Sequence, residues 1–286
     1  MFKIAVLQRL YNLSDDQAEY QVRDRASFQR FLGLHVEDGS PDAKTLWSFK
    51  ERLKETELTD VLFARFDSAL SDQGLAAKGG QIVDAVIVEV PRQRNTPEEN
   101  ATIKEGKIPE GWTEQPAKLC QKDLDACWTK KRGQTYYGYK DHVNVDQEHK
   151  LIRAQAVSDA SVHDSQAMDA VLASATKDRA VYADSAYRSA ERESWLEERG
   201  LESRICERRY RNRPMTDEQK SENKCKSAVR ARVEHTFGFV HTSMNGIYVR
   251  SIGVARAKMH IGLMNLAYNL ARYAQIKRLQ RQAQLA

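Results

Sequence analysis

The sequence has no run of apolar residues approaching the roughly 20 that a membrane-spanning helix requires, which excludes a transmembrane protein. Its start, MFKIAVLQRLYNLSDDQ, has one lysine and no small-residue cleavage site, and its apolar residues recur at helical spacing. We therefore expect the first helix of a fold and not a signal peptide. Cysteine is also scarce, and the four cysteines form no Cys-x-x-Cys pair. We therefore expect no structural zinc site, and we expect the thiols to be reduced, as they are in a cytoplasm.

Positive charge is concentrated in the last part of the chain. Residues 204–286 contain 17 lysines and arginines against 5 acidic residues, whereas the first 203 residues contain 28 against 35. Solvated helix faces are the simpler explanation, but an imbalance of this size favours a polyanion partner, most often nucleic acid. We therefore expect a cytoplasmic protein that associates with the nucleoid.

Residues 1–76 are predicted to form a small all-α domain. Apolar residues follow a helical period through several short segments, and Ser14 suits the N-cap of the second helix. The segment GSPDAKTLWSFKERLKE has a Ser-Pro-Asp start that is typical of a helix beginning. Short helices joined by tight turns suit either a DNA-binding bundle or a dimerisation module, and composition does not separate these alternatives.

Residues 77–286 are predicted to form an α/β domain. The strand-like segments are QIVDAVIVEV, QTYYGYKDHVNVD, KLIRAQAVSDA, AVYAD and LESRICER. Helical patterns occupy DSQAMDAVLASA, AERESWLEERG, and residues 226–243 and 254–283. Residues 92–131 are polar, contain three prolines and show no clear period, so they are predicted to form a long, mobile loop. The order of elements indicates an α/β core behind an all-α front.

Three carboxylates stand out in the α/β domain. Asp84 lies inside a strand pattern that should be buried, where an unpaired charge is costly. Asp184 ends the strand AVYAD, at a strand end where sites gather in α/β sheets. Glu234 lies on a helix, beside the apolar stripe and on the same flank as Arg230 and His241.

Each carboxylate also has a purely structural interpretation. Asp184 could cap the next helix, Glu234 could pair with Arg230 across one turn, and Asp84 could pair with a lysine from a neighbouring strand. Together, however, three carboxylates from two strands and one helix suit hard divalent cations such as Mg²⁺. Two such ions, roughly 3.5–4 Å apart, would activate the attacking oxygen and stabilise the leaving oxygen in phosphodiester chemistry.

Three blocks of the sequence resemble those of a known family. IVDAVIVEV, VYADSAYRS and RARVEHTFGFVH are similar to the three catalytic blocks of bacterial insertion-sequence transposases of the IS-five family. The N-terminal helical segments and the strands YYGYKDHVNVD and SDASVHDS are similar to other parts of that family, so the resemblance covers nearly the whole chain. It implies a DDE enzyme with an RNase H-like mixed sheet flanked by helices. Full-length relatives usually have a further stretch before the first helix, so we expect that part of the usual N-terminus is missing.

The resemblance also implies roles for individual residues. Asp84, Asp184 and Glu234 are expected to be the catalytic triad and the metal ligands, with Asp84 bridging two Mg²⁺ ions, for which Mn²⁺ substitutes. Arg230 matches a basic position that contacts DNA near the cut, and His241 stands where many relatives have lysine or arginine. A basic loop is expected to contact phosphates through Arg208, Arg209, Arg211 and Arg213.

The sequence therefore predicts a DNA transposase that hydrolyses phosphodiesters at transposon ends and transfers strands into target DNA. Its partners would be double-stranded DNA, namely terminal inverted repeats and target DNA, and a second copy of the chain in a homodimer on DNA. One alternative is a truncated or co-opted transposase remnant that binds DNA without catalysis. Another is a stand-alone, structure-selective nuclease with the same fold and metals.

Overall fold

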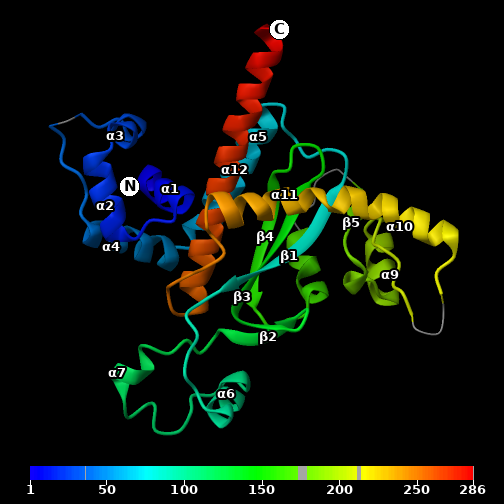
Figure 1. Ribbon diagram of the computed structural model, residues 1–286, viewed down its shortest axis with the longest axis horizontal. Helices are drawn as coiled ribbons and strands as arrows, with labels where there is room; N and C mark the ends of the chain where they lie inside the picture. Colours follow the sequence, from blue (N-terminus) through cyan, green and yellow to red (C-terminus); the bar gives the residue numbers. More distant parts are fainter. Residues whose placement is uncertain (36, 173–178, 211–213, 286) are drawn as a thin grey trace.

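The computed structural model describes residues 1–35, 37–172, 179–210 and 214–285 of the chain (Figure 1). Its centre is a six-stranded mixed sheet with strand order β2-β3-β1-β5-β6. The sixth strand, β4, pairs with the part of β3 that follows the part paired with β2. The strands are β1 (Gln81–Glu89), β2 (Cys127–Lys131), β3 (Gln134–Asp146), β4 (Ile152–Asp159), β5 (Ala180–Tyr182) and β6 (Glu202–Ser203). The predicted α/β architecture with a mixed sheet flanked by helices is confirmed.

The long strand β3 organises the antiparallel part of the sheet. It pairs with β1 along one edge and with β2 and then β4 along the other. Gly138 sits where β3 changes partner, at a φ of +152°, and a Cβ there would overlap the carbonyl oxygen of Val88 in β1. Glycine is therefore required for the close approach of these two strands. Strands β5 and β6 continue the sheet from β1 in the parallel sense.

The N-terminal segment is helical, as predicted. It forms α1 (Phe2–Tyr11), α2 (Asp15–Asp24), α3 (Ala26–Leu32), α4 (Ala43–Glu55) and α5 (Leu58–Asp72). Ser14 caps α2 through a capping box with Gln17, which confirms its predicted role. The helix that begins after Ser14 ends at Asp24, and α3 follows as a separate helix because Arg25 is extended between them. The side chain of Gln29 donates to the carbonyl of Arg23, which this break leaves without a helical partner.

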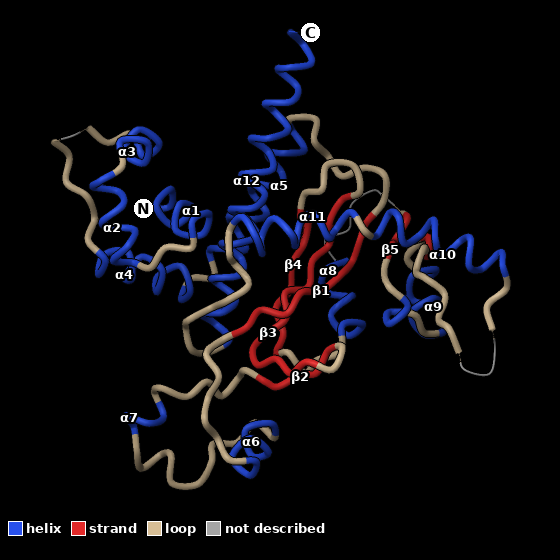
Figure 2. The backbone as a smooth tube through the Cα atoms, in the orientation of Figure 1, coloured by secondary structure: helices blue, strands red, loops and turns tan. Residues whose placement is uncertain are grey.

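The C-terminal helix joins the N-terminal helices to the sheet. Helix α12 (Val254–Leu285) runs beside α5 between these two parts of the molecule, and its end projects beyond them (Figures 1 and 2). Met259 and Leu263 of α12 are buried against Ala5 and Leu53 of the N-terminal helices. The predicted boundary after residue 76 falls between α5 and β1, but the two parts share this apolar core.

The opposite face of the sheet carries α8 and α9, which pack against Val83 and Val181. Helix α10 lies on the same side as α11, with Val229 packed against the main core (Figure 2). The remaining helical elements are α6 (Pro97–Lys104), α7 (Pro116–Leu119), η1 (Asp164–Ala167), α8 (Met168–Leu172), η2 (Ser185–Tyr187), α9 (Ala190–Glu198), α10 (Asp217–Arg230), α11 (Arg232–Gly238) and the π-helical η3 (Phe239–Ser243). The last residues of the predicted helix DSQAMDAVLASA lie outside the described residues. None of the helices within the described ranges is both long and apolar enough to cross a bilayer.

Residues 92–131 are not a loop without regular structure, and that prediction is wrong. They form α6, α7 and the strand β2. Helix α6 has its own start signal, with Thr96 as N-cap, Pro97 at the first helical position and Glu99 completing a capping box. Trp112 is buried and donates to Glu99 at 2.8 Å, so the segment has a small core of its own.

The helix predicted at 226–243 is longer and is interrupted. Helix α10 begins at Asp217 and ends at Arg230, α11 follows from Arg232, and η3 has π-helical spacing. A π-helical turn contains more residues than an α-helical turn, so a spacing of seven residues no longer returns to the same face. This change of period affects His241, which lies within η3.

Candidate active site

Asp84 lies within β1, and Asp184 lies at the same level of the sheet, two residues after the end of β5. Strands β1 and β5 are parallel, and Ile82 pairs with Tyr182. Asp84 follows Ile82 by two residues, and Asp184 follows Tyr182 by two residues. Because side chains alternate along a strand, the two carboxylates leave the sheet on the same face. This register brings together two of the three predicted acidic residues.

Burial and neighbouring charges act on Asp84 in opposite directions. Burial raises the pKa of its carboxyl most strongly, and the negative charge of Asp184 raises it further. The backbone N–H of Ala85, which donates to Asp84 Oδ1 at 2.8 Å, and the charge of Arg230 act to lower this pKa. The net shift is upward, as expected where two carboxylates are close and one is removed from water. Such a pair favours binding of a cation.

Asp184 has a structural role as well as this position. Its Oδ1 accepts a hydrogen bond from the backbone N–H of Ala186 at 2.7 Å, so it is the N-cap of η2. The capping interpretation of Asp184 is thus confirmed. Since a carboxylate has two oxygens and several lone pairs, capping through one oxygen leaves the other free to accept a further partner.

Arg230 is tied to Asp84 and not to Glu234. Its Nη1 donates to Asp84 Oδ2 at 2.9 Å, from the last residue of α10 to the middle of β1. The alternative that Glu234 pairs with Arg230 is therefore wrong, and the partner of Asp84 is an arginine from a helix and not a lysine from a strand. Because the two residues are 146 positions apart in the sequence, no local pattern predicted this pair.

Glu234 stands apart from the two aspartates. It lies in the first turn of α11, its side chain is exposed, and it makes no ion pair or side-chain hydrogen bond with the described residues. The neighbouring Val233 is fully buried in the main core, which fixes the rotation of α11 against the sheet. Across the described residues, no three acidic, histidine or cysteine side chains are grouped closely enough to hold a metal ion.

The remaining predicted basic residues are spread over the surface. His241 is exposed in η3, and Arg208 and Arg209 are exposed after β6. Arg211 and Arg213 lie outside the described residues. None of the described members of this set contacts Asp84 or Asp184.

Tyr187 lies beside the carboxylates and was not among the predicted site residues. It is buried, and its hydroxyl has no hydrogen-bond partner in the described part of the chain. Burial raises its pKa most, followed by the negative charges of Asp84, Asp164 and Asp184. The 3₁₀ turn of η2 brings Tyr187 back towards Asp184, three residues before it. That spacing was the available signal in the sequence.

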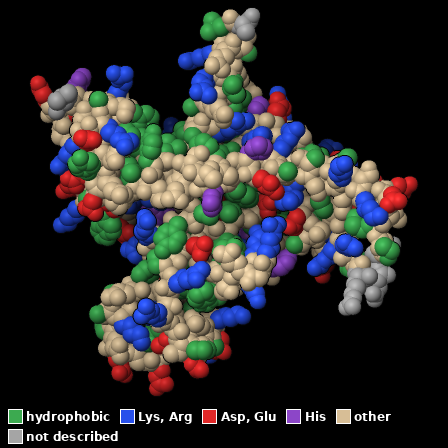
Figure 3. All heavy atoms as spheres, viewed as in Figure 1, with side chains coloured by type: hydrophobic (Ala, Val, Ile, Leu, Met, Phe, Trp, Pro, Cys, Tyr) green, Lys and Arg blue, Asp and Glu red, His purple; other side chains and the backbone are tan. Residues whose placement is uncertain are grey.

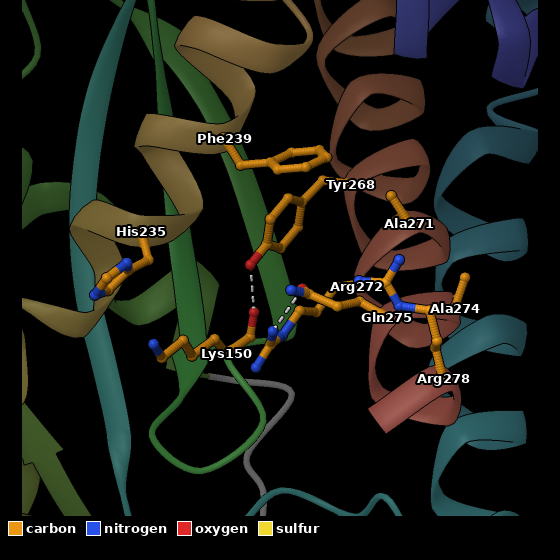
Figure 4. Close-up of a pocket in the computed structure, with 9 residues that line it drawn as sticks. All are labelled: Lys150, His235, Phe239, Tyr268, Ala271, Arg272, Ala274, Gln275 and Arg278. Carbon is orange, nitrogen blue, oxygen red and sulfur yellow. Dashed lines mark hydrogen bonds between the residues drawn. The ribbon is translucent and has the colours of Figure 1, made fainter. Parts of the chain in front are cut away.

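A basic groove runs along the other side of α11 (Figure 4). It has a volume of about 580 Å³, and none of its lining residues is acidic. His235 and Phe239 approach it from one side, whereas Arg272 and Arg278 approach it from α12 (Figure 4). Burial lowers the pKa of Lys150 in this groove, and the charges of Arg272 and Arg232 lower it further. Such crowding of positive charge favours binding of anions.

Comparison with known proteins gives two matches along the chain. A family model described as Transposase DDE domain matches residues 76–270, which is more than half of the chain. A second model, described as Transposase domain (DUF772), matches residues 1–52. No solved structure matches the chain. The two matched ranges correspond closely to the α/β and helical parts of the fold.

Proposed function

The chain belongs to the family of DDE transposases, and we propose that Asp84, Asp184 and Glu234 carry its chemistry on DNA. Both family models describe transposase domains, so the predicted transposase function is confirmed and the non-catalytic alternative is not favoured. Placement within the IS-five family stays a prediction. The observation that supports the assignment of the site most directly is the parallel register that sets Asp84 beside Asp184.

The two aspartates suit a divalent cation. Transposases of this family use such an ion, and we propose Mg²⁺, two ions per site, with Mn²⁺ as a substitute. Carboxylate oxygens are the ligands that Mg²⁺ prefers, and burial beside a like charge makes Asp84 a strong candidate ligand. The ions supply activation of water and stabilisation of charge on the phosphodiester.

Glu234 would complete the site from α11. Arg230, one helical turn before it, is bonded to Asp84, and the buried Val233 anchors α11 to the core. These two contacts hold the start of α11 near β1, although the carboxylate of Glu234 faces solvent. Tyr187 is buried close enough for the charges of both aspartates to raise the pKa of its hydroxyl.

The proposed reaction has two steps. Water attacks a phosphodiester at the transposon end, the bond from phosphorus to the 3′ oxygen breaks, and a 3′-OH and a 5′-phosphate are formed. That 3′-OH then attacks a phosphodiester of target DNA in line and displaces the target's own 3′ oxygen. One phosphodiester replaces another in this second step, so no covalent enzyme intermediate is needed.

DNA follows from the family as the substrate, and we propose that the basic groove beside α11 contacts its backbone. The groove lacks acidic lining residues and adjoins the helix that carries Glu234. Lysine and arginine side chains are also visible along the projecting end of α12 and over the region of α10 (Figure 3). We further propose that two copies act as a homodimer on DNA, because joining two terminal inverted repeats to one target requires both ends to be held.

A cleavage and strand-transfer assay on the element's own end DNA tests this proposal, with Mg²⁺ or Mn²⁺ and with a chelator. Asp84→Asn should abolish cleavage and leave DNA binding largely intact, because it removes a metal ligand but few phosphate contacts. Parallel loss of binding in Asp84→Asn would count against the assignment of Asp84. Cut products without joined strands would instead identify a structure-selective nuclease.

A further inference from the structure

A second cavity lies between the N-terminal helices and the segment that follows η3. It has a volume of about 400 Å³, and we call it the Arg9–Arg250 cavity. None of Asp84, Asp184 and Glu234 lines it, so it is distinct from the candidate active site. The side chains that define it come from α1, α4, the segment 248–252 and α12: Arg9, Trp47, Tyr248, Arg250, Ser251 and His260.

Positive charge in this cavity exceeds negative charge. Two carboxylates line it, and both already have partners, Asp15 with Lys50 at 2.5 Å and Glu51 with Arg256 at 2.7 Å. Arg9 and Arg250 remain, as the described residues provide no ion pair for either side chain.

Arg9 is the more unusual of these two cations. Burial lowers its pKa to about 10, the negative charge of Asp15 acts against this shift, and the nearby charge of Arg250 adds to it. A partly buried guanidinium is stabilised when an anion pairs with it. The cavity therefore has two positive charges available to an anionic ligand.

Two buried polar atoms of the cavity wall also lack partners. Ser251 Oγ and His260 Nδ1 are inaccessible to solvent, and neither has a hydrogen-bond partner among the described residues. Buried polar atoms without partners are uncommon and destabilising, which suggests that a ligand satisfies them. The Ser251 hydroxyl can donate to an oxyanion, as can a guanidinium.

Exposed aromatic rings stand at the same cavity. Trp47 and Tyr248 line it and are 52% and 39% exposed, and the Arg250 guanidinium lies over the Tyr248 ring at 5.6 Å. Large exposed aromatic side chains next to cations provide a stacking surface for nucleic acid bases. The cavity thus combines the two recognition chemistries that one nucleotide requires.

We propose that the Arg9–Arg250 cavity binds one nucleotide of a DNA strand, its phosphate held by Arg9, Arg250 and Ser251 and its base placed against Trp47 or Tyr248. The proposal rests on the proposed function, which supplies DNA as the ligand. It gives the N-terminal helices a part in DNA binding, one of the two roles that the sequence left open.

The position of the cavity connects it to the active site. Tyr248 pairs with Glu89, the last residue of β1, the strand that carries Asp84. The five steps along the strand from Asp84 to Glu89 span about 17 Å. Tyr248 and Asp84 are therefore separated by a distance that a single DNA strand can bridge.

The test is a titration of the full-length chain with labelled end DNA, in chelator and over a series of salt concentrations. Arg250→Gln should weaken binding about tenfold and reduce the slope of log K against log salt by about 0.9. The matched control is Arg199→Gln, which removes another exposed arginine over an aromatic ring, Trp195, on α9. It should leave both the affinity and the slope unchanged.

Ser251→Ala separates binding from folding. If the unpaired hydroxyl serves a ligand, its removal weakens DNA binding while the Tm of the free protein stays level or rises. Wild-type affinity and slope in both Arg250→Gln and Ser251→Ala would overturn this proposal alone. Failure of the wild-type chain to bind DNA would overturn the proposed function itself.

A competition experiment distinguishes a DNA strand from a free nucleotide as the source of the phosphate. A deoxynucleoside monophosphate should displace labelled DNA only weakly, because it lacks the contacts of the neighbouring phosphates. If the mononucleotide binds tightly through Arg250 while DNA binding is indifferent to Arg250→Gln, the assignment to a DNA strand is overturned.

Discussion

Arg230 Nη1 lies 2.9 Å from Asp84 Oδ2, so the helix that leads to Glu234 is bonded to the strand that carries the first predicted catalytic carboxylate. Both side chains are largely shielded, with exposed fractions of 25% and 16%. The pair fixes the orientation of Asp84 and offsets part of the effect of its burial. It also couples α10 to the sheet at the point where the chain turns into α11.

We predict measurable coupling between these two residues in the free energy of unfolding. A double-mutant cycle of Asp84→Asn and Arg230→Gln, measured in chelator, should give an interaction free energy of about 1 kcal/mol. We expect this value because a partly shielded ion pair is stronger than an exposed one. The matching cycle of Asp84→Asn and Glu234→Gln should give a value near zero, because Glu234 has no contact with Asp84 among the described residues. Equal coupling in both cycles would contradict the arrangement of α11.

Local sequence signals predicted much of the fold. Strands β1 and β3 were recognised because β-branched and aromatic residues dominate them, and Ser14 was recognised as a cap from its position before a helical period. The start of α6 carried similar signals in Thr96, Pro97 and Glu99. These were missed because the surrounding segment has no helical period of its own.

The contacts that build the site were less predictable. The parallel pairing of β1 with β5, which sets Asp84 beside Asp184, joins segments about a hundred residues apart. The preference of Arg230 for Asp84 over Glu234 depends on where α10 ends against the sheet, which no spacing rule contains. The convergence of all three carboxylates was expected from the sequence, but in the structure only the two aspartates lie together.

Asp141 should make the stability of the protein depend on pH. Its carboxyl is buried in β3, accepts from Asn265 of α12 at 2.9 Å, and has a pKa raised by burial to about 7. Since the folded state then holds more protons at this carboxyl than the unfolded state, the contribution of Asp141 to the free energy of unfolding falls as pH rises from about 4 to about 7. Burial lowers the pKa of His142 to about 4 and also lowers that of His260, so these residues add stability over the same range. The loss at Asp141, on the order of 2–4 kcal/mol, is therefore measured as the difference between the urea unfolding profiles of the wild type and Asp141→Asn.

Asp141→Asn should remove this loss from the profile, because the amide does not ionise. Asp72→Asn, at an exposed position near the end of α5, is the matched control and should keep the wild-type slope. If Asp141→Asn and the wild type run parallel between about pH 4 and 7, Asp141 does not titrate in the folded protein as expected.

His241→Lys should tighten DNA binding. His241 is exposed in η3, on the segment that continues from α11, and lysine would add a full positive charge there. If His241 faces the backbone of DNA, the slope of log K against log salt should steepen by up to about 0.9. An unchanged slope would show that the π-helical turn of η3 directs His241 away from the DNA-facing surface.

Lys150→Gln should weaken DNA binding without destabilising the protein. The ammonium of Lys150 has no acidic partner in the basic groove, and Arg272 and Arg232 already disfavour its charge. Removing it therefore relieves repulsion in the free protein, so the Tm should stay level or rise, while one phosphate contact and about 0.9 of the salt slope are lost. Lys107→Gln, at an exposed position after α6 and outside this groove, should change neither quantity. Misfolding would lower both the Tm and the affinity for DNA. A lower affinity with an unchanged or higher Tm in Lys150→Gln would therefore identify the groove as a surface that binds DNA. Equal affinities of Lys150→Gln and the wild type would exclude the groove as such a surface.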